Sequence, residues 1–215
     1  MIKRLEAGVP FPDISEIEDG YIAYGGDLSP TRLEEAYLRG IFPYYAFRYT
    51  DILWSCPLDR FVIFPSEIHV SHSMRTLING GRFRVTFNQD FTDVIIGCAV
   101  ADGRIAEDMA WLGEDMINAY VALHNEGKAE SVEVWDVAGE LIGGLYGVSL
   151  RGCFFGESMF SLRPNASKLA LVSLAQRMGR DGGKMIDCQY ETPHLLSMGG
   201  RHISYGEYIK IINEP

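Results

Sequence analysis

The sequence predicts an α+β protein in which a meander of antiparallel strands is followed by a helix and one more strand. Two observations predict it. From Ser131 the apolar residues recur with a period of two over three consecutive segments, and from Asn165 they take the spacing of one helical face. With 215 residues, 47% of them hydrophobic, the chain can form one or two domains. We expect a small N-terminal α/β lobe over residues 1–64 and a larger domain over 65–215.

The N-terminal half is expected to contain three helices. The first lies within 28–40, where Ser29 can cap the free amides, Pro30 suits the first helical position and Gly40 ends the helix. The other two cover 91–99 and 114–125. The segments between the first and second helix, 41–45 and 54–57, are rich in aromatic residues and proline and are expected to be loops.

The C-terminal half carries the meander and two more helices. Turn residues at Ala138-Gly139 and Arg151-Gly152 separate its strands. The expected elements are, in order, strands over 132–134, 141–148 and 153–157, a helix from Asn165 ended by Gly179, a short buried strand over 184–189, and a helix capped by Ser204 that runs to about Ile212.

The composition indicates in which cellular compartment the protein resides and argues against zinc and disulfide sites. The apolar runs are only a few residues long, whereas a membrane span needs roughly 20, and the first residues lack the apolar core of a secretory signal. We therefore expect a cytoplasmic protein without membrane contact. The four cysteines form no C-x-x-C pair, which favours free thiols over a zinc site or a disulfide framework.

The charge is unevenly distributed. The net charge is −10, yet no acidic residue occurs between Ile68 and Gln89 or between Ser158 and Arg180, while the first 35 residues are rich in acids. Such a chain can present a basic face to an anionic substrate and an acidic face to a cationic one. The alternative is chance clustering on solvated helix faces.

Two polar groups stand in otherwise apolar strands. Glu157 follows an aromatic strand, so its carboxylate either pairs with an internal cation such as Lys168 or Arg163 or awaits a cationic ligand. Asp187 and Gln189 are two apart and would share one strand face, where the carboxylate can orient the amide and enrich its carbonyl oxygen. The alternative for this pair is a capping hydrogen bond at a strand end.

Large aromatic residues are candidate platforms for a nucleobase, because a base stacked on a ring gains about 1 to 3 kcal/mol; the alternative is that they belong to the core. These residues are Tyr37, Tyr44, Tyr45, Trp54, Trp111, Tyr120 and Trp135. His69 and His72 are spaced for one helical face, but no third ligand has suitable spacing, so we expect no metal.

The motifs, taken in order, resemble those of the leucyl/phenylalanyl-tRNA-protein transferases over about residues 20 to 200. The matching segments are Gly25-Gly26-Asp27-Leu28-Ser29-Pro30, Ala36-Tyr37, Gly40-Ile41-Phe42-Pro43, Trp54-Ser55, Ser131-Val132-Glu133-Val134-Trp135, Gly143-Gly144-Leu145-Tyr146-Gly147, Gly156-Glu157-Ser158-Met159-Phe160-Ser161, Asn165-Ala166-Ser167-Lys168 and Ile186-Asp187-Cys188-Gln189.

The resemblance implies an activity and a fold. It implies a bacterial enzyme that moves Leu or Phe, and by extension Met, from aminoacyl-tRNA to the N-terminal Arg or Lys of a protein and so marks that protein for proteolysis through the N-end rule. The implied larger domain is an acyl-CoA N-acyltransferase-like (GNAT-like) mixed sheet flanked by helices. No cofactor is implied, and with no heptad pattern in the sequence we expect a monomer.

The resemblance also assigns residues. Asp187 and Gln189 take the positions of the proposed catalytic pair, and Glu157 lies beside the aminoacyl group and the attacking amine. The expected substrate-binding residues are Tyr37, Tyr44, Trp54, Trp111, Tyr120, Leu145, Phe154, Ser158 and Met159. The acid-free segments offer Arg75, Arg82, Arg84 and Lys168 to the phosphates of the tRNA acceptor stem.

The chain departs from the family pattern at several positions. Tyr44 and Leu53 stand where the family has tryptophan, Ala110 where it has threonine and Glu130 where it has histidine. These differences bear on donor preference and tRNA affinity more than on fold. Two other functions compete with the main interpretation: an acyl-CoA-dependent N-acyltransferase, and a non-catalytic module that binds aminoacyl-tRNA or basic N-termini.

Overall fold

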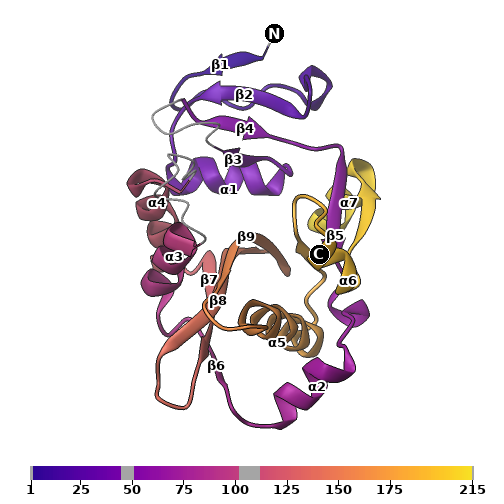
Figure 1. Ribbon diagram of the computed structural model, residues 1–215. Helices are drawn as coiled ribbons and strands as arrows, with labels where there is room; N and C mark the ends of the chain where they lie inside the picture. The colour runs from indigo at the N-terminus through magenta and orange to yellow at the C-terminus, as the bar shows by residue number, and fades with distance from the viewer. Residues whose placement is uncertain (1, 45–50, 102–111, 215) are drawn as a thin grey trace.

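The computed structural model describes residues 2–44, 51–101 and 112–214 and contains two sheets (Figure 1). The smaller sheet is built from the first quarter of the chain, and its strand order is β1 (Lys3–Leu5), β2 (Tyr21–Gly25), β4 (Leu53–Ser55), β3 (Phe42–Tyr44). β1 runs parallel to β2, and the other pairs are antiparallel. The helix α1 (Pro30–Leu38) lies against this sheet, and a 3-10 turn covers Ile14–Glu16.

The larger sheet has seven strands. Their order is β11 (Arg201–Ser204), β5 (Asp59–Ile63), β10 (Met185–Asp187), β9 (Cys153–Ser161), β8 (Leu141–Leu150), β7 (Ala129–Trp135), β6 (Arg84–Phe87). Every pair is antiparallel except β9 with β10. A parallel pair needs a crossover connection, and α5 (Ala166–Asp181) supplies it.

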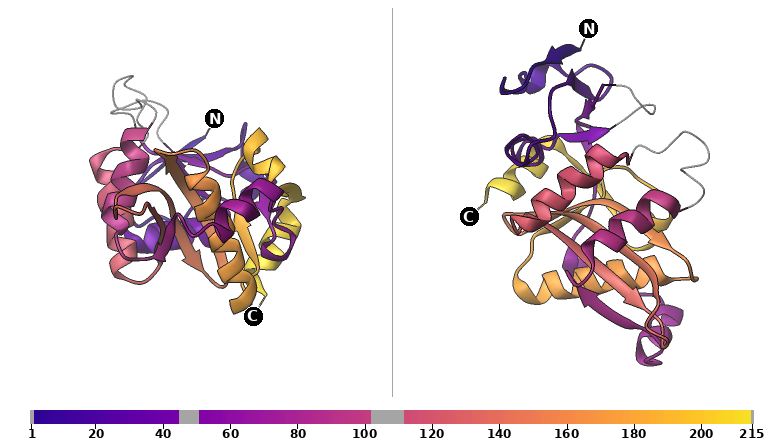
Figure 2. Two further views of the ribbon diagram at one scale, coloured as in Figure 1. Left: turned by 60° about the horizontal axis from the view of Figure 1, so that its bottom comes forward. Right: turned by 90° about the vertical axis from the view of Figure 1, so that its left-hand side faces the viewer.

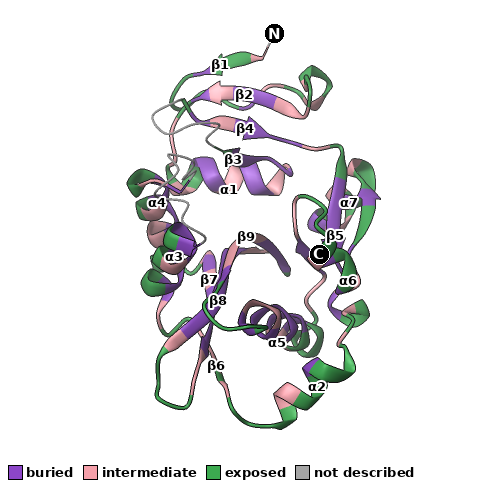
Figure 3. Cartoon of the chain, viewed as in Figure 1, coloured by how far each residue is buried: buried purple, intermediate pink, exposed green. Residues whose placement is uncertain are grey.

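Helices cover both faces of the larger sheet. α3 (Phe91–Val100) and α4 (Glu114–Asn125) lie on one face and α5 on the other (Figures 1 and 2). Side chains alternate between the two cores, because successive strand residues point to opposite faces. Tyr146 and Phe155 belong to the α3/α4 core, whereas Leu145 and Phe154 belong to the α5 core. Figure 3 shows these central strands as the buried interior.

The remaining elements lie at the rim of the larger sheet. They are a 3-10 turn over Pro65–Glu67, α2 (His72–Asn79), α6 (Pro193–Ser197) and α7 (Tyr205–Asn213). Thr192 caps α6, because its side-chain hydroxyl accepts a hydrogen bond from the Leu195 amide. α6 therefore starts a few residues after Gln189, which follows the end of β10. None of the helices in the described part of the chain combines the length and the apolar composition that spanning a bilayer requires.

Most of the predicted elements are confirmed. α1 begins after the Ser29 cap with Pro30 in its first turn, α4 has the predicted bounds, and Ser204 caps α7. The three strands of the meander are present and each is longer than predicted. These elements carry their signals locally, in caps, turns and periodicity.

Three predictions are wrong. The expected loops 41–45 and 54–57 contain β3 and β4, which pair with each other; Pro43 is tolerated because β3 is an edge strand. α5 continues past Gly179 to Asp181 and ends at Gly182, which adopts the left-handed conformation that stops a helix. The strand expected over 184–189 ends at Asp187.

Several elements were not predicted: β1, β2, β5, β6, β11, α2 and α6. The strands among them have three to five residues and pair with distant segments, so they have little local signal. The division into domains 1–64 and 65–215 stays a prediction. β5 lies before that boundary in sequence and pairs within the larger sheet.

Strands β8 and β9 approach closely at Gly147. A Cβ atom there would clash with the Phe155 carbonyl oxygen and would lie 2.7 Å from the Phe154 ring. Overpacking of this kind is relieved only by moving backbone.

We therefore expect Gly147→Ala to lower the free energy of unfolding by about 3 kcal/mol. Urea denaturation followed by circular dichroism measures this loss. Gly206→Ala in α7 is the matched control, because no atom lies within 4 Å of its added Cβ, and it should leave the free energy of unfolding unchanged or raise it by up to about 1 kcal/mol. Equal stability of the two variants would contradict the close approach.

Candidate functional site

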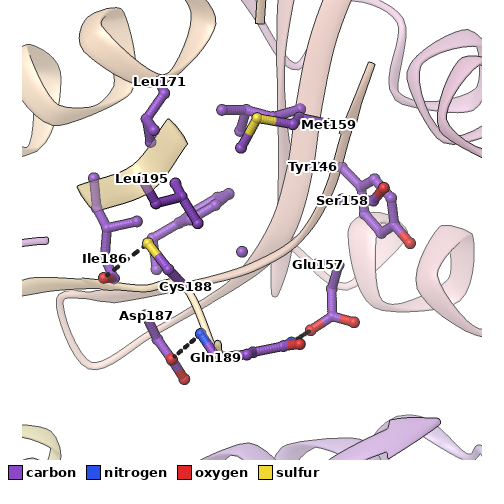
Figure 4. Close-up of a pocket in the computed structure, with 13 residues that line it drawn as sticks. Tyr146, Glu157, Ser158, Met159, Leu171, Ile186, Asp187, Cys188, Gln189 and Leu195 are labelled. Atoms are coloured by element: carbon purple, nitrogen blue, oxygen red, sulfur yellow. Dashed lines mark hydrogen bonds between the residues drawn. The ribbon is translucent and has the colours of Figure 1, made fainter. Parts of the chain in front are cut away.

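A cavity of about 200 Å³ opens between the central strands and the helices α5 and α6. Its lining residues are Leu145, Tyr146, Phe154, Gly156, Glu157, Ser158, Met159, Leu171, Ile186, Asp187, Cys188, Gln189 and Leu195. Figure 4 shows Met159, Leu171 and Leu195 gathered at one end and Glu157 with Gln189 at the other. The cavity is therefore an apolar pocket with a polar mouth, the usual form of a small-ligand site.

A β-bulge positions Glu157. Gly156 pairs with Gly147 and Ser158 pairs with Tyr146, so Glu157 is the extra residue between two ladder positions. A bulge turns the local side chain away from the regular alternation. Its carboxylate accepts hydrogen bonds from Tyr120 Oη at 2.7 Å and from Gln189 Nε2 at 2.8 Å. The alternative partners weighed from the sequence, Lys168 and Arg163, do not pair with it; Arg163 binds Asp136.

Gln189 lies just beyond the end of β10. Its φ angle is +63°, a left-handed conformation that non-glycine residues adopt only when their surroundings hold them there. The Asp187 Oδ1 atom accepts the backbone N–H of Gln189 at 2.8 Å. Asp187 thus makes the capping hydrogen bond that was the alternative interpretation, and the expectation that it contacts the amide side chain is wrong. The carboxylate that holds the amide is Glu157.

Asp187 is fully buried and paired with Arg60, which is 1% exposed. Arg60 Nε lies 3.0 Å from both carboxylate oxygens and Nη2 lies 2.8 Å from Oδ2, which also accepts the Tyr208 hydroxyl at 2.7 Å. Burial alone would lower the pKa of the Arg60 guanidinium, but the Asp187 charge and hydrogen bonds, together with the neighbouring Tyr208, outweigh burial and raise it. Asp187 borders the cavity, but its carboxylate oxygens are engaged by Arg60, Tyr208 and the Gln189 backbone.

Two tyrosine hydroxyls connect Glu157 to the N-terminal part of the chain. Tyr37 of α1 and Tyr120 of α4 are both fully buried, and their hydroxyl oxygens lie 2.6 Å apart. Burial, followed by the nearby Glu157 charge, raises the pKa of both hydroxyls well above its ordinary value, so both stay neutral donors. A continuous chain of hydrogen bonds thus runs from α1 to the mouth of the pocket.

The same environment shifts the titration of Glu157. Burial raises the pKa of this carboxyl from 4.5 to about 7, although the hydrogen bonds from Tyr120 and Tyr37 oppose the shift. A carboxyl that titrates near neutral pH at the mouth of a pocket is a candidate for a group that handles protons or amines.

The structure brings part of the predicted set together. Leu145, Phe154 and Met159 line the apolar pocket with Glu157. Ser158 also borders the cavity, on the side of Tyr146 and away from the apolar end (Figure 4).

The predicted aromatic platforms have different environments. Trp54 is fully buried, donates from Nε1 to the Gly25 carbonyl oxygen at 2.8 Å and packs edge-on against Phe11, so it has no ring face open to a base. Trp135 is held similarly, with Nε1 bonded to Thr86 and Arg84 over its ring. Tyr44 is 40% exposed. Trp111 and Tyr45 lie outside the described residues.

The predicted phosphate-binding residues lie on several elements. Arg75 is on α2, Arg82 in the loop after it and Arg84 at the start of β6, and all three are exposed. Lys168, in the first turn of α5, is half-buried at a second cavity together with Ser71 and Met74 at the start of α2. Among the described residues, no three His, Cys, Asp or Glu side chains converge as a metal site requires.

Sequence reasoning missed the groups that support this site. These are Arg60 and Tyr208 around Asp187, and Leu171, Ile186, Cys188 and Leu195 in the pocket wall. The helical spacing of α5 could have indicated Leu171. Ile186 and Cys188 flank Asp187 in the strand that the sequence did predict. Arg60, Leu195 and Tyr208 gave no local signal, because each is brought to the site by a separate element.

We expect the stability of Glu157→Gln relative to the wild type to rise with pH. Between pH 4.5 and about 7 the unfolded carboxyl is ionised while the folded one remains protonated, so the wild type loses stability as pH rises through this window. The neutral variant avoids this loss, so its stability relative to the wild type should rise by roughly 1 to 2 kcal/mol between pH 5 and pH 8. Urea denaturation at pH 5, 7 and 8 measures it.

Glu140→Gln, in the exposed loop between β7 and β8, is the control and should show no such trend. A gain for Glu157→Gln that is the same at all three pH values would contradict the raised pKa.

Comparison with known proteins gives consistent matches. Residues 62–213 match the family model Leucyl/phenylalanyl-tRNA protein transferase, and residues 26–58 match the model of its N-terminal domain. The leucyl/phenylalanyl-tRNA–protein transferase of Syntrophus aciditrophicus (strain SB) is 49% identical over 96% of this chain and 85% of the relative. That of Anaeromyxobacter sp. (strain Fw109-5) is 49% identical over 97% and 88%.

Among solved structures, L-PGS from Bacillus licheniformis superposes with a TM-score of 0.42 at 10% identity, over 77% of this chain and 50% of that one, too distant a likeness to bear on function. The sequence matches extend over nearly the whole chain and include the pocket, the bulge and the strand end described above. The protein is therefore a member of the leucyl/phenylalanyl-tRNA–protein transferase family.

Proposed function

We propose that this chain transfers leucine or phenylalanine from aminoacyl-tRNA to the N-terminal Arg or Lys of a protein, which marks that protein for proteolysis through the N-end rule. The observation that carries the proposal is the contact between Gln189 and Glu157 at the mouth of the apolar pocket. It supports a site where an apolar side chain and a cationic amine meet.

The pocket suits the donor side chain. An apolar cavity of about 150 Å³ can hold a molecule of the size of benzene, and this one has about 200 Å³. Met159, Leu171 and Leu195 would surround an unbranched-at-Cβ side chain such as that of Leu, Phe or Met. Met159 has three rotatable bonds and can adjust to any of them.

The polar mouth suits the acceptor amine. Glu157 supplies negative charge for an amino group, and Gln189, whose Nε2 is held by Glu157, keeps its carbonyl oxygen free to accept a hydrogen bond from the amine. The amine nitrogen then attacks the ester carbonyl carbon. A C–N bond forms, the C–O bond to ribose breaks, the nitrogen loses one proton and the ribose oxygen gains one, leaving a lengthened protein and free tRNA.

Positioning can account for much of the rate. The ester is already activated, so holding the amine and the ester side by side can lower the barrier by several kcal/mol. In this proposal Gln189 and Glu157 touch the reacting groups. Asp187 acts indirectly, because it fixes the Gln189 backbone, and Tyr37 and Tyr120 hold Glu157 in place.

The remaining contacts extend the proposal to the rest of the tRNA. Tyr44 and Trp111 would meet the 3′ adenosine, and Arg75, Arg82, Arg84 and Lys168 would meet acceptor-stem phosphates, whose contacts are salt-dependent. We also propose a GNAT-like arrangement for the larger sheet, based on its mixed order with a parallel pair next to the site. The enzyme would act in the cytoplasm, where aminoacyl-tRNA is available, and it would act as a monomer.

A transfer assay tests the proposal. Radiolabelled Leu-tRNA is incubated with the protein and with two peptides that differ only in beginning with Arg or Ala. We expect label on the Arg peptide alone, because the Glu157 mouth and the acidic N-terminal segment favour a cationic end. Binding of tRNA without transfer would favour a non-catalytic module, and activity only with acyl-CoA would favour the other acyltransferase.

Replacement of Gln189 tests its role. Gln189→Ala should lower kcat at least tenfold and leave KM for aminoacyl-tRNA within about twofold, because in this proposal the amide contacts the acceptor amine and not the donor side chain. Gln176→Ala, exposed on α5, is the matched control and should keep wild-type kcat. An equal effect of Gln189→Ala on both constants would assign Gln189 to binding instead.

A further inference from the structure

We infer that Arg60 is a positioning residue for the transfer reaction, which it serves by holding Asp187 so that Gln189 stays against Glu157. The kinetic part of this inference rests on the proposed function. The structural part, the control of the Gln189 backbone by Arg60, stands on the contacts alone.

Arg60 is fixed in every direction. Besides its bonds to Asp187, its Nη1 donates to the Gly40 carbonyl oxygen at 3.0 Å and its Nη2 to the Tyr208 hydroxyl at 3.3 Å. The guanidinium carbon lies over the rings of both Phe42 and Tyr208, 4.8 Å from each ring centre. A buried guanidinium with this many partners has one orientation.

Asp187 passes this orientation to Gln189. Its Oδ1 atom accepts from both Arg60 Nε and the Gln189 backbone N–H, at 3.0 and 2.8 Å. If Arg60 shifts, the carboxylate turns with it and the left-handed backbone at Gln189 loses the bond that holds it. The Gln189 amide would then leave Glu157.

The contacts of Arg60 come from three separate parts of the chain. Gly40 and Phe42 follow α1, Tyr208 is on α7 and Asp187 ends β10. The packing leaves little slack, since a Cβ on Gly40 would lie 2.8 Å from the Tyr208 ring. Arg60 therefore ties the segment after α1, which leads to Tyr44, to the strand end that carries the amide.

Stability alone does not explain this arrangement. Burying an ion pair costs desolvation free energy, and an apolar pair of similar volume is often equally stable or more so. The ion pair supplies a unique geometry, because the planar guanidinium donates its N–H bonds to the carboxylate oxygens in one plane.

The test compares Arg60→Lys with Arg32→Lys. Both remove a buried guanidinium and keep the positive charge. Arg32 is 5% exposed, pairs with Glu35 at 3.0 Å and lies over the Phe11 ring, but it has no bonded path to Gln189. Thermal unfolding gives the structural cost of each substitution. Steady-state transfer gives kcat and KM, and NMR gives the hydrogen-exchange rate of the Gln189 backbone amide.

We expect both variants to lose similar stability, while only Arg60→Lys lowers kcat, by about tenfold, with KM for aminoacyl-tRNA unchanged. In the same variant the Gln189 amide should exchange at least tenfold faster. Wild-type kcat and wild-type Gln189 exchange in Arg60→Lys would overturn the inference and leave Arg60 a purely structural residue.

Tyr208→Phe provides a second variant in case Arg60→Lys does not fold. It keeps both charges and the aromatic ring and removes only the hydroxyl bonded to Asp187. We expect a smaller change in the same direction in kcat and in Gln189 exchange, and no change in either would count against the inference. A wild-type protein without transfer activity would refute the proposed function, while the exchange rates would still decide the positioning role.

Discussion

The buried ion pair between Arg60 and Asp187 is the constraint on which the rest of the site depends. Neither charge reaches solvent, and each has enough partners to be satisfied. Removing either partner would leave an unpaired buried charge, which costs about 3 to 5 kcal/mol. The chain must therefore bring β5, β10 and α7 together before Gln189 has a defined position. Formation of the fold and assembly of the site are in this sense one event.

The site also depends on both faces of the larger sheet. The apolar pocket belongs to the α5 face, with Leu145 and Phe154, while Tyr120, which bonds Glu157, comes from the α3/α4 face. A regular strand presents a side chain to one face only. The bulge at Glu157 removes this restriction, so one carboxylate borders the pocket and also ends the hydrogen-bond chain from α1. The glycine at 147 allows β8 to approach β9 beside this bulge.

The chemistry assigned to the pair at 187 and 189 changes when it is seen in three dimensions. Spacing in the sequence placed both side chains on one strand face, with the carboxylate next to the amide. In the structure β10 ends at Asp187, and the left-handed turn at Gln189 sends its amide to Glu157. The two polar motifs that the sequence kept separate are thus one unit. Asp187 holds the backbone of Gln189, and Glu157 holds the side chain of Gln189.

Local signals in the sequence were enough to predict α1, α4, α7 and the three-strand meander, because caps, turns and periodicity act over a few residues. Polar groups in apolar strands were enough to single out Glu157, Asp187 and Gln189 as candidates, and their roles stay a proposal. The motifs were enough for the family. Only the tertiary structure decided that Trp54 is core, that β3 and β4 are strands, and that Arg60, Leu195 and Tyr208 belong to the site. Each of these depends on contacts between segments far apart in the chain, and burial and pairing of that kind leave no local pattern to read.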